Sequence, residues 1–163
     1  MQELIKNWLS EENLNKAKGK TREELFAEFG NVLEPIAYID SVYLPYLGDN
    51  ITDNRVYSGK GYFIDHAVNH HPEVKIEDYD DIQVILSNPD GVFLDDSKAN
   101  LSIVFVKQYK NWGTVVVGVD NENAKIVLHK SFFSQRKNSY AKFNDIRVKI
   151  PLVGGQSTVS PAE

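Results

Sequence analysis

Three consecutive β-type segments in the second half of the chain constrain its fold more than any other feature. They span residues 101–109, 114–120 and 124–133, and each is rich in β-branched or aromatic side chains. Residues 120–123 have the sequence Asp-Asn-Glu-Asn, which is typical of a tight turn. Because short connections join antiparallel neighbours, the pattern predicts an antiparallel meander.

Helical signals fill the first part of the chain. Residues 3–29 favour two helices, and Ser10 is placed to cap the residues that follow it. Thr21 and Glu24 have the spacing of a capping box at the start of a short helix. Gly30 is expected to end that helix.

Further elements are expected between the N-terminal helices and the meander. Residues 36–44 favour a strand, and residues 62–71 favour a helix that Pro72 ends. Asp78 is placed to cap another helix over residues 79–86. The order of elements predicts an α+β fold, in which N-terminal helices are followed by helices packed on a roughly four-stranded antiparallel sheet.

The length of 163 residues is that of one ordinary domain with a small addition. We expect an N-terminal helical extension over residues 1–34 and an α+β domain over residues 35–152, which a segment at 145–150 would close. Residues 153–163 are expected to form a flexible tail, because small and polar residues dominate them.

Composition excludes several classes of protein. The chain has no cysteine, so disulfides, thiolate zinc sites and thiol nucleophiles are ruled out. No apolar run approaches the length of a membrane-spanning helix, and we expect no membrane partner. The first residues lack the basic and apolar layout of a secretory signal.

Charge is distributed unevenly along the chain. Residues 100–163 hold nine Lys or Arg against four acidic residues, a balance of +5, whereas residues 1–99 have a balance of −10. A basic C-terminal face would attract a polyanion, although a solvated surface without a partner explains the charges equally well. Aromatic residues among these bases could stack on RNA bases; they are Tyr109, Trp112, Phe132, Phe133 and Tyr140.

Three of the four histidines lie within six residues, at positions 66, 70 and 71. On a helix His66 and His70 share a face, while His71 points about 100° away. The His-x-x-x-His spacing suits a metal, but Ala67 stands where a zinc protease has its glutamate. A site would need an Asp or Glu from elsewhere, and Asp65 and Glu73 are poor candidates for it. We therefore predict no metal and no cofactor.

General acid–base catalysis on an RNA phosphodiester fits the histidines better. Such a ribonuclease removes a proton from a 2′-hydroxyl, gives one to the leaving 5′-oxygen and stabilises the charge on the phosphoryl group. Lys107 ends one β segment, and Ser131 lies near the end of the last. We predict that both converge with His66, His70 and His71. Lys107 and Lys130, each taken alone, could simply be solvated residues at the ends of strands. The expected substrate-binding residues are Tyr109, His129, Lys130 and Arg136.

The order of these features resembles the phage-associated nuclease-like domains of the Barnase–EndoU–colicin–RelE group. The resemblance covers about residues 36–150 and includes the Tyr-Phe-Ile-Asp-His-Ala-Val-Asn-His-His run that starts at Tyr62. It implies a small α+β fold with a four-stranded antiparallel sheet and metal-independent cleavage of RNA. Its helix histidines correspond to His66 and to His70 or His71, its strand base to Lys107 and its late hydroxyl to Ser131.

The resemblance also implies an origin in a phage or prophage. We expect RNA as the partner, with transfer RNA as one candidate, and a phage structural protein or an inhibitor as a further partner. The expected location is the cytoplasm of a bacterial host or the virion. Two alternatives stay open: a non-catalytic virion or assembly protein that keeps the fold, and a zinc-dependent hydrolase.

Overall fold

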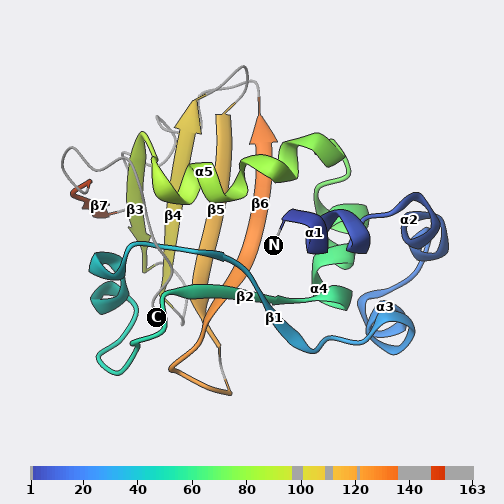
Figure 1. The fold of residues 1–163 in the computed structure, drawn as a ribbon, viewed down its shortest axis with the longest axis horizontal. Helices are drawn as coiled ribbons and strands as arrows, with labels where there is room; N and C mark the ends of the chain where they lie inside the picture. The colour runs from blue at the N-terminus through green and yellow to red at the C-terminus, as the bar shows by residue number, and fades with distance from the viewer. Residues whose placement is uncertain (1, 97–100, 109–111, 121, 136–147, 153–163) are drawn as a thin grey trace.

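A mixed sheet with helices on one face and at one edge forms the architecture of the computed structural model (Figure 1). The structure describes residues 2–96, 101–108, 112–120, 122–135 and 148–152. The predicted α+β class is confirmed. None of the helices in these ranges has the length and apolar character needed to cross a membrane.

The sheet has seven strands in the order β1-β2-β6-β5-β4-β3-β7. The strands are β1 (Leu33–Tyr38), β2 (Arg55–Gly59), β3 (Gly91–Asp95), β4 (Ser102–Gln108), β5 (Trp112–Val119), β6 (Val127–Gln135) and β7 (Val148–Ile150). All neighbours are antiparallel except β2 and β6, which run parallel. The prediction of a four-stranded, wholly antiparallel sheet was therefore wrong, although the meander β4-β5-β6 is confirmed.

Short strands account for the error in the sheet. β2 and β3 have five residues each, and both follow segments rich in turn-forming residues that obscure their alternation. The predicted strand at 36–44 ends early, because the chain turns into the 3₁₀ helix η1 (Ser41–Tyr46). Asp40 caps η1 by accepting a hydrogen bond from the backbone N–H of Val42 at 3.0 Å.

Three helices, not two, precede β1: α1 (Gln2–Trp8), α2 (Glu11–Ala17) and α3 (Arg22–Phe29). The predicted caps explain the division. Ser10 accepts a hydrogen bond from the N–H of Asn13, and Thr21 and Glu24 form the predicted capping box. Gly30 ends α3 with a φ of 73°, a conformation that favours glycine.

The remaining helices lie against the sheet. They are α4 (Lys60–Asp65), η2 (His66–His70), η3 (Ile76–Asp81) and α5 (Ile82–Ser87). The predicted helix at 62–71 is thus an α-helix that continues as a π-helical turn, and the predicted helix at 79–86 begins as a 3₁₀ helix. Figure 1 shows α5 across the face of β4–β6, with α4 and the N-terminal helices beyond β6.

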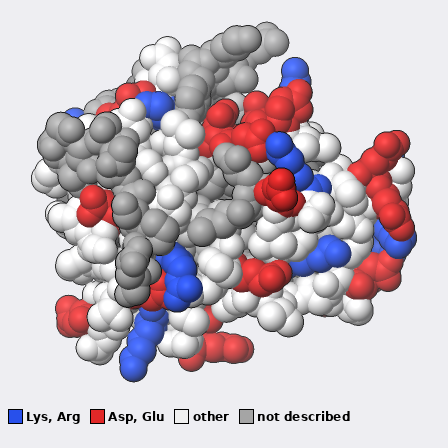
Figure 2. Space-filling view, viewed as in Figure 1, with Lys and Arg blue, Asp and Glu red and all other residues white. Residues whose placement is uncertain are grey.

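One apolar core joins these layers. Ile85 and Leu86 of α5 are buried with Phe105 of β4 and Val117 of β5. Leu25 of α3 belongs to the same cluster, so residues 2–29 pack onto the domain that follows them. A second, smaller cluster lies on Phe93, Val104 and Val106. Figure 2 shows acidic side chains at the edge that α2 and α3 form.

Candidate active site

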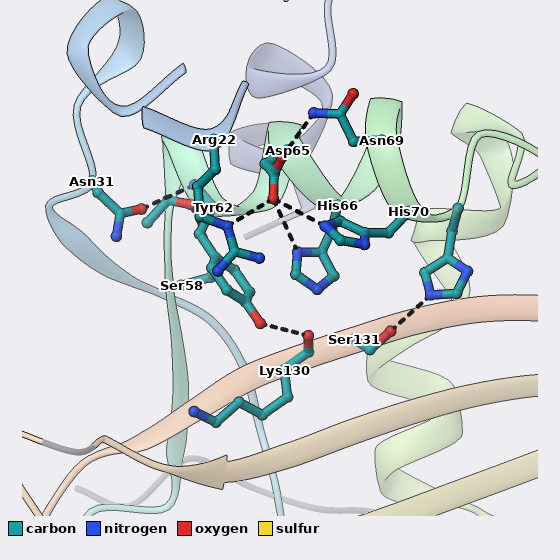
Figure 3. Close-up of polar contacts among 12 residues, drawn as sticks. Arg22, Asn31, Ser58, Tyr62, Asp65, His66, Asn69, His70, Lys130 and Ser131 are labelled. Atoms are coloured by element: carbon teal, nitrogen blue, oxygen red, sulfur yellow. Dashed lines mark hydrogen bonds and ion pairs between the residues drawn. The ribbon is translucent and has the colours of Figure 1, made fainter. Parts of the chain in front are cut away.

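His66 and His70 lie on the continuous helix formed by α4 and η2, and His71 follows it directly. Its second part is a π-turn, in which the N–H of His71 donates to the carbonyl of His66 at 2.9 Å, one residue farther back than in an α-helix. Single π-turns of this kind occur frequently at functional sites. His70 lies at the exposed end of the helix (Figure 3), and His71 contacts Ser131 of β6.

Asp65 is the centre of the first group of contacts. Its side chain is only 3% exposed, yet its Oδ2 lies 3.0 Å from Arg22 Nε and 3.3 Å from His70 Nε2. Its Oδ1 accepts a hydrogen bond from Asn69 Nδ2 at 2.8 Å. Burial raises the pKa of Asp65, but the hydrogen bonds from Asn69 and Arg22 and the nearby positive charges lower it below its ordinary value. The carboxylate therefore stays ionised at neutral pH.

An aromatic stack runs along the same helix. The ring centroids of Tyr62 and His66 are 4.3 Å apart, and those of His66 and His70 are 4.6 Å apart. Burial lowers the pKa of His66 to about 4, and the charge of His70 acts in the same direction. His66 is therefore a neutral ring at pH 7, and it packs against the ring of His70. The predicted shared face of His66 and His70 is confirmed.

His71 makes a second group of contacts, with β6 and with the chain after η2. Its Nε2 lies 3.1 Å from Ser131 Oγ, and its Nδ1 lies 3.2 Å from Glu73 Oε1. Its ring also stacks on Phe133 at 5.1 Å. Glu73 can accept a hydrogen bond from Nδ1 in the tautomer that carries its ring proton on that nitrogen. Nε2 is then free to accept the hydroxyl proton of Ser131.

Lys107 lies outside this cluster. It pairs with Gly113 of β5, which in turn pairs with Ser134 of β6. A whole strand therefore separates Lys107 from β6, and its position along the sheet is three residues beyond Ser131. Its Nζ donates to the carbonyl of Asn88, at the end of α5, at 2.7 Å. The structure does not bring Lys107 together with the histidines.

His129 is a core residue rather than a surface contact. Its side chain is buried, with 3% exposure, and its ring centroid lies 5.1 Å from that of Phe63. Among the described residues neither ring nitrogen has a hydrogen-bond partner. Burial lowers the pKa of His129 to about 3, with the charges of His66 and His71 in the same direction. The role of His129 in substrate binding stays a prediction, and its buried ring leaves little surface for a contact.

A β-bulge in β6 changes the directions in which the side chains of residues 129–131 point. Ser131 pairs with Val116 and His129 pairs with Val117, so Lys130 is the extra residue. The Lys130 side chain extends over Gly118 of β5 and away from the histidines (Figure 3). Burial lowers its pKa, against the opposing effect of Asp120.

The predicted contacts Tyr109 and Arg136 lie outside the described residues. The carbonyl of Lys130 does belong to the site, because it accepts a hydrogen bond from Tyr62 Oη at 2.8 Å. This bond attaches the histidine helix to β6.

Asp65, His66 and His70 could hold a metal ion, since their ligand atoms all lie within 4.8 Å of one another. The guanidinium of Arg22, however, already provides a positive charge to the oxygen of Asp65 that would bind such an ion. The absence of a metal from the activity stays a prediction.

Sequence reasoning missed several members of the site. It considered Asp65 and Glu73 only as metal ligands, and it gave Arg22 no role. The four-residue spacing of Asp65 and Asn69 is a local signal that could have been noticed. Arg22 precedes Asp65 by 43 residues, and no local pattern connects the two.

A scan against protein families matches residues 36–142 to the family described as phage-Barnase-EndoU-ColicinE5/D-RelE like nuclease3. The match covers more than half of the chain and includes the whole histidine helix and β6. The chain belongs to this family. No curated protein and no solved structure matched it.

Membership of this nuclease-like family confirms the resemblance inferred from the sequence, including its association with phage. The match begins at residue 36, so α1, α2 and α3 precede the matched region. Arg22, which contacts Asp65, therefore comes from outside the part of the chain that the family describes.

Proposed function

We propose that the protein is a metal-independent endoribonuclease that cleaves RNA by transesterification. The observation that carries this proposal is a pair of adjacent imidazoles, His70 and His71, each with its own carboxylate partner. A carboxylate beside an imidazole orients the ring and stabilises the charge that the ring takes on accepting a proton. Membership of a nuclease-like family supports the proposal.

His71 acts as the general base. Glu73 holds the ring proton on Nδ1, so Nε2 presents its lone pair towards Ser131. A substrate 2′-hydroxyl that enters beside Ser131 would donate its proton to the same nitrogen. The side chain of His71 is 27% exposed, which leaves room for a substrate to approach it.

His70 acts as the general acid. It is the most exposed of the three rings, at 46%, and the carboxylate of Asp65, 3.3 Å from its Nε2, orients the ring. The protonated ring gives its proton to the 5′-oxygen as that oxygen leaves. His66, with a pKa of about 4, is neutral at pH 7, and it positions His70 through the ring stack.

The proposed step is balanced without any further reactant. The 2′-oxygen forms a bond to phosphorus as His71 takes its proton, and the bond from phosphorus to the 5′-oxygen breaks as His70 supplies a proton. The products are a 2′,3′-cyclic phosphate and a free 5′-hydroxyl. Ser131 orients the attacking hydroxyl and is not consumed.

The test is cleavage of purified RNA in the presence of a chelator, followed by analysis of the product ends. We expect cyclic phosphate ends, and we expect no cleavage of an oligonucleotide whose scissile residue is 2′-deoxy. Cleavage of the deoxy substrate, or complete loss of activity in chelator, would contradict the proposal. Absence of cleavage would leave a non-catalytic phage protein as the better interpretation.

A further inference from the structure

The proposed reaction needs a cation, and neither of the two predicted lysines that the structure describes supplies it. Negative charge develops on the phosphoryl oxygens during transesterification, and an Arg or Lys side chain usually stabilises it. Lys107 contacts the end of α5, and Lys130 extends over Gly118, away from the histidines. Arg22, by contrast, contacts Asp65, the carboxylate partner of His70 (Figure 3).

The contacts of Arg22 leave most of its donors available. Its bond to Asp65 uses Nε, and its Cζ lies 5.3 Å from the centre of the Tyr62 ring. A guanidinium has four further N–H donors on its two Nη atoms. The side chain is 44% exposed, so these donors can reach a ligand at the surface. Asp65 keeps Asn69 and His70 as partners if Arg22 moves.

The segment that carries Arg22 has a fixed position on the histidine helix. The N–H of Gly61 donates to the carbonyl of Gly30 at 2.8 Å, and the N–H of Tyr62 donates to Asn31 Oδ1 at 3.0 Å. At the other end of the helix Asn69 donates to the carbonyl of Lys20 at 3.1 Å. The residues just before and just after α3 are thus bonded to opposite ends of the histidine helix, and this fixes the position of α3.

Close approach at Gly61 shows that the contact between α3 and α4 is tight. A Cβ atom at this position would lie 2.6 Å from the carbonyl oxygen of Gly30 and 2.8 Å from a ring carbon of Phe26. Glycine is therefore required if the two helices are to meet as they do. Arg22 is placed at the site by a specific interface.

We propose that Arg22 is the catalytic residue that binds the phosphoryl group of the substrate. It comes from the N-terminal helices, outside the family match, so the site is completed by a segment that the family does not describe. A planar guanidinium can donate two parallel hydrogen bonds to a phosphate, which suits this role better than an ammonium group. The inference rests on the proposed ribonuclease function and adds a residue to the same site.

The chain offers a matched control for this proposal in Arg55. Its Nε lies 2.9 Å from Asp53 Oδ1, its side chain is 45% exposed, and its Cζ lies 5.6 Å from the centre of the Tyr57 ring. Arg55 thus resembles Arg22 in exposure, ion pairing and ring contact, but within the described residues the aspartate that it binds has Tyr57 and no histidine as its other partner.

The experiment compares the variants Arg22→Gln, Arg22→Lys and Arg55→Gln in the full chain. We expect Arg22→Gln to slow RNA cleavage about 10²-fold, as the loss of a donor to a developing charge does elsewhere. Arg22→Lys should keep part of the activity, because it retains the charge but not the paired donors. Arg55→Gln should leave the rate unchanged.

Binding of an all-2′-deoxy oligonucleotide, which cannot react, gives a second readout. The loss of one phosphate contact should lower the slope of log affinity against log salt concentration by about 0.7 for a single strand. We expect this change in Arg22→Gln but not in Arg55→Gln, and a purely structural role would not produce it. If Arg22→Gln fails to fold, the partial activity of Arg22→Lys decides the matter.

The outcomes separate this inference from the proposed function. Equal cleavage rates and equal salt slopes for Arg22→Gln and Arg55→Gln would overturn the role of Arg22, even if the wild-type protein cleaves RNA. If the wild-type protein does not cleave RNA, the proposed function fails, while a reduced salt slope in Arg22→Gln would still support Arg22 as a phosphate-binding residue.

Discussion

Two regions of the molecule have the same three kinds of side chain in nearly the same arrangement. Each has an aspartate, an arginine whose Nε bonds to it, and a tyrosine ring under the guanidinium. The first, the Asp65 cluster, consists of Asp65, Arg22 and Tyr62. The second, the Asp53 cluster, consists of Asp53, Arg55 and Tyr57.

The two clusters differ in what else the aspartate contacts. Asp53 accepts three bonds from Arg55, one of them from its backbone N–H, and a fourth, at 2.6 Å, from Tyr57 Oη, so these partners all lie within four residues of it in the chain. Asp65 accepts one bond from Arg22, and its other partners are Asn69 and His70.

This difference distinguishes the Asp53 ion pair, which only stabilises the fold, from the Asp65 ion pair, which belongs to the candidate active site. The contacts of Asp53 are local and mostly exposed, so the pair stabilises the start of β2 and little else. Asp65 is nearly fully buried and ionised beside a half-exposed imidazole, an arrangement that costs desolvation and gives the imidazole a fixed negative partner. An arginine paired with an aspartate is therefore not in itself a sign of function. The neighbouring histidine is the distinguishing feature.

The largest expected effect comes from removing that histidine. His70→Gln would make the Asp65 cluster resemble the Asp53 cluster, and we expect RNA cleavage to fall by about 10²- to 10⁴-fold, the contribution typical of a general acid. A single-turnover cleavage assay measures the effect. His66→Gln is the companion variant and should cost less, because His66 supports the ring without transferring a proton. Equal losses in the two variants would contradict the assignment of the acid.

Acid pH should lower the stability in two separate ranges, the upper one set by two buried histidines and the lower one by the Asp53 cluster. The pKa values of His66 and His129 are lowered to about 4 and about 3 in the folded protein, so the unfolded chain binds more protons below about pH 6.5. The free energy of unfolding should therefore fall as the pH drops from about 6.5 to 4, by a few kcal/mol at about 1.4 kcal/mol per pKa unit.

The Asp53 cluster should respond in a lower pH range. The hydrogen bond from Arg55 lowers the pKa of Asp53 to about 2, against the effect of burial, so its contribution is lost only as the pH falls from 3.8 towards 2. Urea unfolding at a series of pH values tests both ranges. His129→Leu should flatten the curve between pH 6.5 and 4, and Asp53→Asn should flatten it only below pH 4. If the slope between pH 6.5 and 4 is unchanged in His129→Leu, the burial of the His129 ring does not lower its pKa.

The smallest expected effects come from the two tyrosine hydroxyls. Tyr62→Phe removes the bond to the carbonyl of Lys130, and Tyr57→Phe removes the bond to Asp53. Each should lower the free energy of unfolding by about 1 kcal/mol. Only Tyr62→Phe should also slow cleavage, because its hydroxyl attaches the histidine helix to β6. A cleavage defect in Tyr57→Phe would weaken the comparison between the clusters.

Local patterns in the sequence predicted the parts of the fold that local contacts determine. The capping box of Thr21 and Glu24, the glycine that ends α3 and the shared face of His66 and His70 all depend on residues three or four apart. The contact of His71 with Ser131, 60 residues away, agrees with the prediction that a helix histidine meets a hydroxyl of the last strand.

The remaining features depend on register and long-range packing. The bulge at Lys130 turns His129 into the core and leaves Ser131 beside His71, and no pattern in the sequence around residues 129–131 announces it. The position of Lys107 depends on which residue of β5 it faces. The role of Arg22 depends on how α3 packs on α4, which the spacing of residues in the sequence does not reveal.

The central claim is that the Asp65 cluster serves catalysis while the Asp53 cluster serves structure. The most direct test is the single-turnover rate of RNA cleavage by Asp65→Asn and Asp53→Asn, measured side by side in chelator at neutral pH. We expect Asp65→Asn to be slower by about 10²-fold, because the acid loses its charged partner, and Asp53→Asn to match the wild-type protein. Equal rates in the two folded variants would contradict the claim.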